Sequence, residues 1–281
     1  MRRNFKSQLQ LFILLVSLPL LNGCSTTSEG RKQFSLVSNE RVARDGERAF
    51  ARLKNRNIIV EKKAEKDFVN CVISKLKPSF DPVTGASTDW EVAIFKSDEA
   101  NAFALPGKKI GVNSGLLRVA VNEAQLAAVL AHEIAHVEAE HGKERTSQQV
   151  ALEGVGLVSG ILGRSSRGNT KNVANTLIAT RGAVQMGLIY PFSKVQEEEA
   201  DLIGLELMTK AGFNPEEALH FWENMEVYGT SGSDSILSTH PSHQARIKVL
   251  QERVRQIQSR AKSSEPAVSA LAPKTCEIGS L

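Results

Sequence analysis

The chain has 281 residues, of which 41% are hydrophobic and 23% charged, enough for one sizeable globular domain or two small ones. Residues 1–23 hold three of the 35 basic side chains and no acidic one, so the rest of the chain has 32 basic against 31 acidic side chains. Because this body is close to neutral, its charge gives no support for a nucleic-acid partner.

Residues 1–23 are typical of an export signal. The basic start MRRNFK leads into an apolar run at 11–21, which is shorter than the ~20 apolar residues of a membrane span. The run ends in Leu-Asn-Gly-Cys, which resembles a bacterial lipobox with Cys24 as the lipidated first residue of the mature chain. Ser25 follows, and by the same resemblance it indicates the outer membrane, with the body on the periplasmic face. A plain signal peptide cut elsewhere, or an uncleaved anchor, is the alternative.

A tether is expected at 24–38, followed by one domain at 39–260 and a flexible tail at 261–281. The domain opens with predicted helices at about 39–54 and 61–77, the second ended by Pro78. Short strands follow, at 90–95, 101–105 and 109–113, with Pro106-Gly107 as the turn between the last two.

The second half of the chain has the pattern of successive helices. Two of them begin near Asn122 and at Ser193, each with a glutamine three residues later, as in a capping box. The helix from Ser193 is expected to end at Gly212, and the next one opens at Asn214-Pro215. A final charged helix is predicted at 242–260.

Two features allow more than one interpretation. Cys71 and Cys276 either form a disulfide, as an oxidising compartment permits, or remain unpaired thiols. The glycine- and alanine-rich residues 150–190 are a packed helical hairpin, a mobile flap or a membrane-touching element.

The sequence His132-Glu133-Ile134-Ala135-His136 has the HExxH pattern. On a helix the two histidines lie about 40° apart, so both imidazoles project from one face and can bind one zinc ion. Glu133 is rotated by about 100° and can act on a zinc-activated water as a general base without being a ligand. The uncharged flanking residues favour a buried metal helix over a helix with surface histidines.

His141 is a less suitable ligand. It lies about 180° around the same helix from His132, so it is interpreted as a structural or surface residue.

A third ligand is expected from the segment SKVQEEEADLIG. Glu197 and Asp201 are spaced i and i+4 and share one helix face, so Glu197 would bind zinc while Asp201 accepts the second ring N–H of a ligand histidine. Glu198 and Glu199 point elsewhere and are expected to be solvated. Gly204 would allow a close approach of two helices.

The segment STHPSHQAR at 238–246 adds a third group of candidates. His240 could stabilise the oxyanion of a hydrolytic reaction, or it could bind the zinc in a resting state. Arg246 could bind a carboxylate, hold the loop or support the substrate. His243 competes with His240, with a surface position as its simplest interpretation.

Together with the earlier segment NAFALPGKKIGVNSGLL, the motifs HEIAH, EEEAD and STHPSHQAR resemble the gluzincin family of the CAAX prenyl proteases and the mitochondrial protease Oma. The likeness is greatest to its bacterial periplasmic branch, the BepA- and LoiP-like lipoproteins, and covers roughly 38–255. It implies an α+β, mostly helical zincin-like domain with a small β-sheet whose edge strand borders the active-site cleft.

The same resemblance implies the site residues. One zinc ion per chain would be bound by His132, His136 and Glu197, with Glu133 as the base. The edge strand would pair with the substrate backbone through Asn101, Ala102, Phe103 and Ala104.

The implied function is a lipid-anchored zinc endopeptidase that removes misfolded or damaged envelope proteins. One alternative is a non-proteolytic assembly factor or chaperone of the outer membrane on the same fold. The intact Glu133 argues against it, because a structural zinc needs no such base. A second alternative, a peptidoglycan-directed metal hydrolase, would normally have a different ligand spacing.

Overall fold

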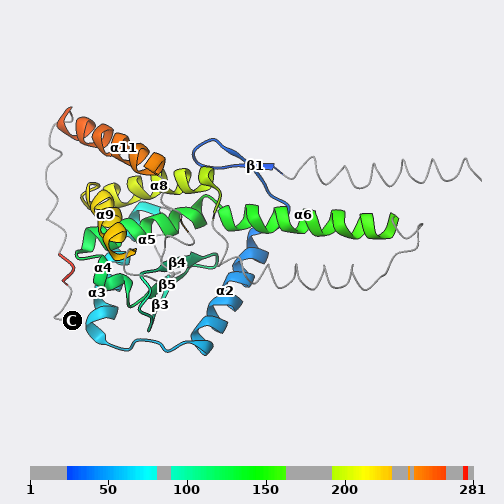
Figure 1. Ribbon diagram of the computed structural model, residues 1–281, viewed down its shortest axis with the longest axis horizontal. Coiled ribbons are helices and arrows are strands. Elements are labelled where there is room, and N and C mark those ends of the chain that lie inside the picture. Colours follow the sequence, from blue (N-terminus) through cyan, green and yellow to red (C-terminus); the bar gives the residue numbers. More distant parts are fainter. Residues whose placement is uncertain are drawn as a thin grey trace, which may run out of the picture. The chain divides into compact units, whose positions relative to one another are not determined.

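The computed structural model describes residues 24–80, 90–162, 192–229, 240, 244–263 and 275–277 (Figure 1). The chain divides into two compact units, Met1–Val42 with Gly142–Gly187, and Ala43–His141 with Leu188–Leu281. Across the ranges described, no helix combines the length and apolar character that a membrane crossing requires. The predicted export signal, residues 163–190 of the glycine-rich segment and most of the predicted tail lie outside the described residues.

The first unit contains a small β-hairpin. Strands β1 (Cys24–Thr26) and β2 (Lys32–Phe34) pair antiparallel, with Cys24 opposite Phe34. In the connecting turn Gly30 has a φ of 82°, a conformation that glycine adopts at little cost. Residues 24–38, predicted as a tether, therefore contain ordered structure.

Helix α6 (His141–Leu162) holds this segment in place. The Arg31 guanidinium donates to both carboxylate oxygens of Glu144, at 3.0 and 2.9 Å. The Ser147 hydroxyl accepts the N–H groups of Leu36 and Val37, at 2.9 and 3.3 Å. Because these contacts join residues more than 100 positions apart, only the folded chain reveals them.

The second unit contains a three-stranded sheet in the order β3-β5-β4. Strand β3 (Glu91–Phe95) runs parallel to β5 (Lys109–Asn113), and β4 (Ala102–Leu105) pairs antiparallel with β5. The predicted turn joins β4 to β5, and Gly107 within it has a φ of 85°. Strand β4 is thus an edge strand, as the resemblance implied.

Helices make up most of this unit, which confirms the predicted fold class. They are α2 (Asn39–Arg56, in this unit from Ala43 onward), α3 (Lys63–Phe80), α4 (Leu116–Val119), α5 (Glu123–Glu138), α8 (Lys194–Lys210), α9 (Glu217–Gly229) and α11 (Gln244–Ser263). The prediction that Pro78 ends its helix is wrong, since α3 continues to Phe80. A proline so close to the helix end removes one backbone hydrogen bond without dividing a longer helix.

The two long helices of the predicted site begin at their predicted caps. The Asn122 side chain accepts the N–H of Gln125 at 2.8 Å, and Ser193 forms a full capping box with Gln196. The first box is incomplete, because the Gln125 side chain accepts the N–H of Val121 at 3.1 Å. At its other end α8 is followed by the predicted glycine, in the left-handed conformation that commonly ends helices.

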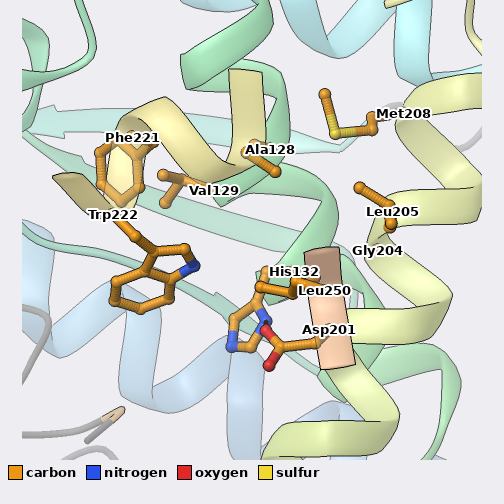
Figure 2. Close-up of a pocket in the computed structure, with 11 residues that line it drawn as sticks. Ala128, Val129, His132, Asp201, Gly204, Leu205, Met208, Phe221, Trp222 and Leu250 are labelled. Atoms are coloured by element: carbon orange, nitrogen blue, oxygen red, sulfur yellow. Dashed lines mark ion pairs between the residues drawn. The ribbon is translucent and has the colours of Figure 1, made fainter. Parts of the chain in front are cut away.

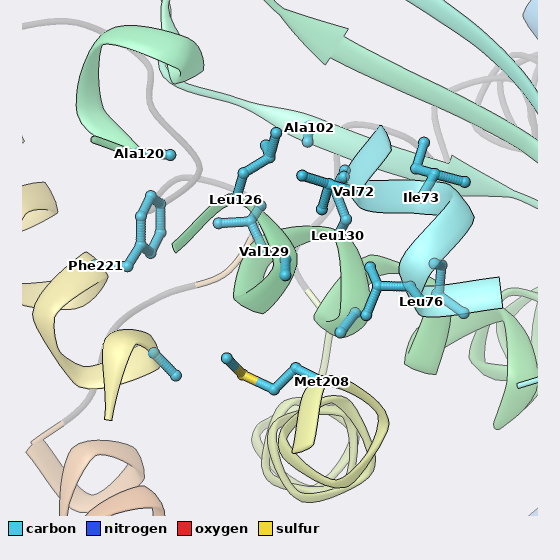
Figure 3. Packing of buried hydrophobic residues seen from close by; sticks show 14 of the residues in the cluster. Val72, Ile73, Leu76, Ala102, Ala120, Leu126, Val129, Leu130, Met208 and Phe221 are labelled. Atoms are coloured by element: carbon cyan, nitrogen blue, oxygen red, sulfur yellow. The ribbon is translucent and has the colours of Figure 1, made fainter. Parts of the chain in front are cut away.

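Helix α5 runs through the hydrophobic core. Its side chains Leu126, Leu130 and Ile134 are fully buried. Around it lie α3, α8, α9 and β4, which contribute residues such as Met208 and Phe221 to the same cluster (Figure 3). Each fully buried side chain of this size stabilises the fold by roughly 1.5–3 kcal/mol. The packing therefore fixes α5, which carries the HExxH residues, in the middle of the unit.

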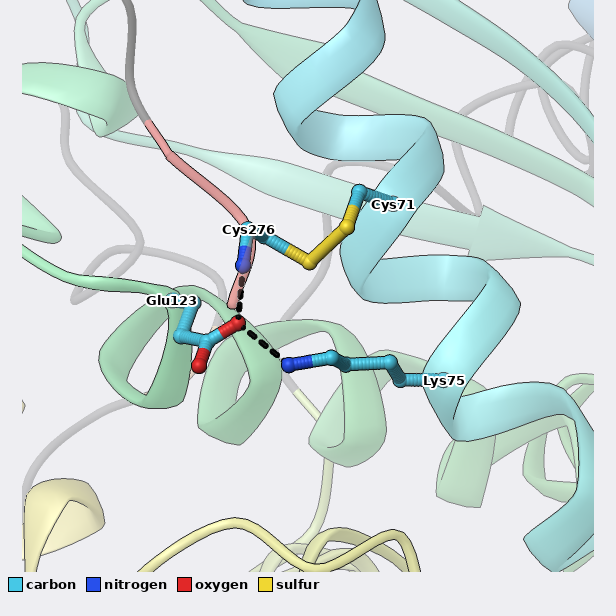
Figure 4. The surroundings of a disulfide bond; sticks show 4 residues. All are labelled: Cys71, Lys75, Glu123 and Cys276. Carbon is cyan, nitrogen blue, oxygen red and sulfur yellow. Dashed lines mark hydrogen bonds and ion pairs between the residues drawn. A yellow bond between two sulfur atoms is a disulfide. The ribbon is translucent and has the colours of Figure 1, made fainter. Parts of the chain in front are cut away.

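A disulfide joins Cys71 of α3 to Cys276, 205 positions later, which is the paired alternative of the sequence analysis (Figure 4). Beside it, Glu123 in the first turn of α5 accepts the Cys276 N–H at 2.8 Å and the Lys75 ammonium at 2.7 Å. The disulfide and these hydrogen bonds attach residues 275–277 to α3 and α5.

Candidate metal centre

The three polar residues of the HExxH pattern lie on helix α5, within the core. The Nε2 atoms of His132 and His136 lie 3.1 Å apart, as expected for i and i+4 on one face. Both rings and Glu133 are buried. The Phe192 ring stacks on the His136 ring, with centroids 3.9 Å apart, and thus covers one face of the imidazole.

Helix α8 brings two carboxylates to these imidazoles. Glu197 places Oε2 3.4 Å from His132 Nε2 and Oε1 3.5 Å from His136 Nε2. Asp201 places Oδ1 3.1 Å from Nδ1 of His132, on the opposite edge of that ring. The structure thus brings together the residues that sequence reasoning chose as ligands, with Asp201 where a supporting carboxylate was expected.

His240 completes the group. Its Nδ1 atom lies 2.9 Å from Glu197 Oε1 and 3.3 Å from His132 Nε2, while its Nε2 lies 3.3 Å from Glu133 Oε1. One donor atom from each of His132, His136, Glu197 and His240 lies within 4.8 Å of the others. Three imidazoles and a carboxylate are the donor types that zinc prefers, and four is its usual number.

The buried charge around these donors also suits a cation. Among the described residues, four carboxylates and one guanidinium are buried around these donors, namely those of Glu133, Glu197, Glu199, Asp201 and Arg246. Burial disfavours the charged form of His132, but Asp201 and Glu197 outweigh this effect and raise its pKa to about 10. Burial also disfavours the charged form of Glu197 and so raises its pKa, yet the contacts with His132 and His240 outweigh this effect and hold that pKa well below the usual range. The site therefore favours a positive charge on His132, whereas burial and the neighbouring positive charges hold the pKa of His136 well below its usual range.

The base candidate Glu133 lies next to the edge strand. Burial raises its pKa above the usual range, while the charges of His240 and His132 and a hydrogen bond from the Ala104 backbone act against this rise. Strand β4 therefore passes beside Glu133. The resemblance implied an edge strand of this kind beside the active-site cleft.

Arg246 has protein partners of its own. Its Nε and Nη2 donate to the two Asp201 oxygens at 2.7 and 2.8 Å, and Nη1 lies 2.8 Å from Glu197 Oε2. The guanidinium carbon also lies 5.2 Å from the Trp222 ring centroid. Of the roles predicted for Arg246, the binding of a carboxylate matches these contacts. The carboxylates that it binds belong to helix α8 and not to a substrate.

Sequence reasoning missed Glu199. It was predicted to be solvated, but it is buried and its Oε2 lies 3.1 Å from Nε2 of His141. His141 is itself fully buried, with Nδ1 2.9 Å from Nδ1 of His136. The prediction assumed one continuous helix, whereas α5 ends at Glu138, Glu140 has a φ of 55° and α6 begins at His141. Because of this break between the two helices, the His141 side chain lies next to His136 of the HExxH pattern.

A largely apolar pocket adjoins the centre (Figure 2). His132 and Asp201 lie at one end, and side chains of α5, α8, α9 and α11 form the rest, including Val129, Phe221 and Trp222. Since Asp201 contacts Nδ1 of His132, this pocket lies on the edge of the ring that faces away from the other donors.

Known proteins resemble this chain in sequence. Residues 66–254 match the sequence model described as Peptidase family M48. The mitochondrial metalloendopeptidase OMA1 of Schizosaccharomyces pombe is 34% identical over 196 residues, 69% of this chain and 55% of that protein. The beta-barrel assembly-enhancing protease of Escherichia coli is 33% identical over 177 residues, 60% of this chain and 35% of that protein. This chain thus spans about half or less of the length of these relatives.

The approach of α8 to α5 can be tested at Gly204. A methyl group there would lie 2.9 Å from the backbone N and 3.0 Å from Cα of His132, so one helix must move. We expect Gly204→Ala to lower the free energy of unfolding by about 1–3 kcal/mol, measured by guanidinium denaturation. Alanine otherwise stabilises a helix relative to glycine, so equal or greater stability would contradict the close contact.

Proposed function

Because the chain belongs to peptidase family M48, we propose that it is a zinc-dependent endopeptidase. The observation that carries this proposal is the position of Glu133, buried between the four converging donors and the edge strand β4. A structural metal site would not require this carboxylate, so the geometry supports hydrolysis over the assembly-factor alternative.

His132, His136 and Glu197 would bind the zinc ion, with Asp201 orienting the His132 ring through its second nitrogen. A zinc ion at this position supplies a Lewis acid, which polarises a peptide carbonyl and acidifies an attacking water. Arg246 keeps Asp201 and Glu197 in place through its hydrogen bonds and charge.

Glu133 performs the proton transfers. It accepts the proton of the attacking water and returns it to the nitrogen of the leaving amine. Its raised pKa suits this task, because a base with a pKa nearer to the working pH both takes up and releases a proton readily.

Strand β4 would align the substrate. Its outer edge has no strand partner among the described residues, so an extended peptide can add to the sheet by backbone hydrogen bonds. Since the Ala104 backbone contacts Glu133, a peptide on this edge would pass beside the base.

His240 would control access to the metal. A catalytic zinc site has three protein ligands and one open position, whereas His240 supplies a fourth donor here. This arrangement would correspond to a resting state, from which His240 would move aside when a substrate binds. In its displaced position the His240 ring could donate a hydrogen bond to the oxyanion of the reaction, which is the other role predicted for it from the sequence.

We further propose that the enzyme acts on misfolded or damaged proteins of the bacterial envelope, anchored to the outer membrane through a lipid on Cys24 and facing the periplasm. The lipobox-like sequence supports the anchor, and the disulfide between Cys71 and Cys276 suits an oxidising compartment. The name of the Escherichia coli relative also connects such proteases with assembly of β-barrel proteins.

Cleavage of casein by the purified, zinc-loaded protein tests the peptidase activity. We expect the wild type to cleave casein, and Glu133→Gln to bind the same amount of zinc and to be at least ~100-fold slower, because glutamine cannot accept the proton. Zinc content is measured by atomic absorption in both. Full activity of Glu133→Gln would contradict the mechanism. Zinc-loaded proteins that are both inactive would indicate either a resting state closed by His240 or an assembly factor, and His240→Ala would then distinguish the two.

His240→Ala tests the resting state. Removal of the fourth donor should leave zinc bound and increase casein cleavage several-fold, with His220→Ala as a control, since His220 is an exposed residue of α9. If the rate of casein cleavage by His240→Ala instead fell by about 10²–10³-fold, His240 would be assigned the role of stabilising the oxyanion.

Replacement of Cys24 tests the anchor. We expect wild-type protein expressed in a Gram-negative host to sediment with the outer membrane and Cys24→Ala to lose this association, because the acyl chains supply the membrane affinity. The double variant Cys71→Ala/Cys276→Ala is the matched cysteine control and should remain in the membrane fraction. An unchanged distribution of Cys24→Ala would indicate the uncleaved anchor.

A further inference from the structure

We propose that His141 and Glu199 form a relay that fixes the tautomer and orientation of His136, so that both histidines of the HExxH pattern are held by carboxylates of α8. This inference rests on the proposed metal site, and it assigns positioning roles to two residues outside the donor set.

The two nitrogens of His136 have different surroundings. Nε2 faces the donors, 3.1 Å from His132 Nε2 and 3.5 Å from Glu197 Oε1. Nδ1 faces the other way, 2.9 Å from Nδ1 of His141. A ring that binds metal through Nε2 must carry its proton on Nδ1, so the atom opposite Nδ1 must be an acceptor.

Glu199 makes His141 that acceptor. An ionised carboxylate has no hydrogen to donate, so the 3.1 Å contact between Glu199 Oε2 and His141 Nε2 requires the proton on Nε2. In a neutral ring Nδ1 then carries a lone pair, which accepts the Nδ1–H of His136. The reverse tautomer of His141 would place two N–H groups against each other and turn the lone pair of Nε2 towards Glu199 Oε2.

The position of Glu199 explains why an intermediate ring is needed. At 100° per residue, Glu199 lies about 200° around α8 from Glu197, whereas Asp201 lies only about 40° from it. Asp201 can therefore reach His132 directly, at 3.1 Å. Glu199 leaves α8 in another direction, and His141 spans the gap to His136.

The surroundings of the relay favour a defined proton arrangement. His141 is fully buried and Glu199 is 5% exposed, so bulk water has little access to their contact. The Phe192 ring stacks on His136 and shields the ring further. A buried carboxylate is costly unless it is paired or hydrogen-bonded, and the Nε2–H of His141 provides such a bond.

The relay predicts a selective effect on metal affinity, because partners of metal-binding histidines commonly contribute 10–100-fold to affinity. Zinc dissociation constants of the purified full-length protein are measured by competition with a chromophoric chelator. We expect His141→Leu, which has no acceptor, to bind zinc about 10–100-fold more weakly. His141→Asn places an amide oxygen near the former Nδ1 and should restore most of the affinity, a rescue that a purely packing role does not predict. His220→Leu, the same replacement on the exposed face of α9, should not alter it.

Glu199 provides a second, independent variant. Glu199→Gln preserves the volume and removes the charge, so it should weaken zinc binding even where His141→Leu fails to fold. In the double variant Glu199→Gln/His141→Leu the loss should not exceed that of His141→Leu alone, because both residues act through one ring. Wild-type affinity in either single variant, or fully additive losses, would overturn the relay.

The affinity measurement also separates this proposal from the proposed function. Weaker zinc binding in the variants of a protein that never cleaves casein would support the relay and reject the peptidase. Casein cleavage by wild type, with unchanged zinc affinity in both single variants, would support the peptidase and reject the relay.

Discussion

At Gly204, helix α8 lies against the backbone of His132 with no space for a side chain between them. This contact determines the distance between the imidazoles of α5 and the carboxylates of α8. Only at such a separation can a side chain as short as Asp201 reach His132. The surrounding core fixes α5 on its other sides, so the position of α8 follows from packing as much as from the polar contacts.

The polar contacts carry a cost of their own. Carboxylates buried near each other repel and lose their hydration unless neighbouring positive charges or hydrogen bonds compensate for them. Arg246 compensates for part of this cost through Asp201 and Glu197, and a divalent cation would compensate for most of the rest. The apolar helices thus hold together a charge arrangement that would not be stable by itself, which is typical of functional sites.

The parts of the site that were predictable from the sequence lie within single helices. HExxH on α5, and Glu197 with Asp201 on α8, follow from residue spacing and recognisable caps, because 3.6 residues per turn fixes which side chains share a face. The errors arose where the chain departs from such regular geometry. The left-handed conformation of Glu140 redirects the chain before His141, and the His141 partner of Glu199 comes from a distant segment. Burial of a charged residue is a property of the assembled fold, so no local pattern indicated it.

The hydrogen bond from Cys276 to Glu123 has a consequence for how the protein matures. The first turn of the helix that carries HExxH is completed by a segment that the ribosome adds about 150 residues later. The disulfide that retains this segment also needs an oxidant, so it closes only after synthesis has passed residue 276. A chain interrupted before that point would contain every metal donor, yet it would lack the last attachment of α5. Because of this order of synthesis, the attachment of Glu123 to residue 276 can form only after the C-terminal segment has been made.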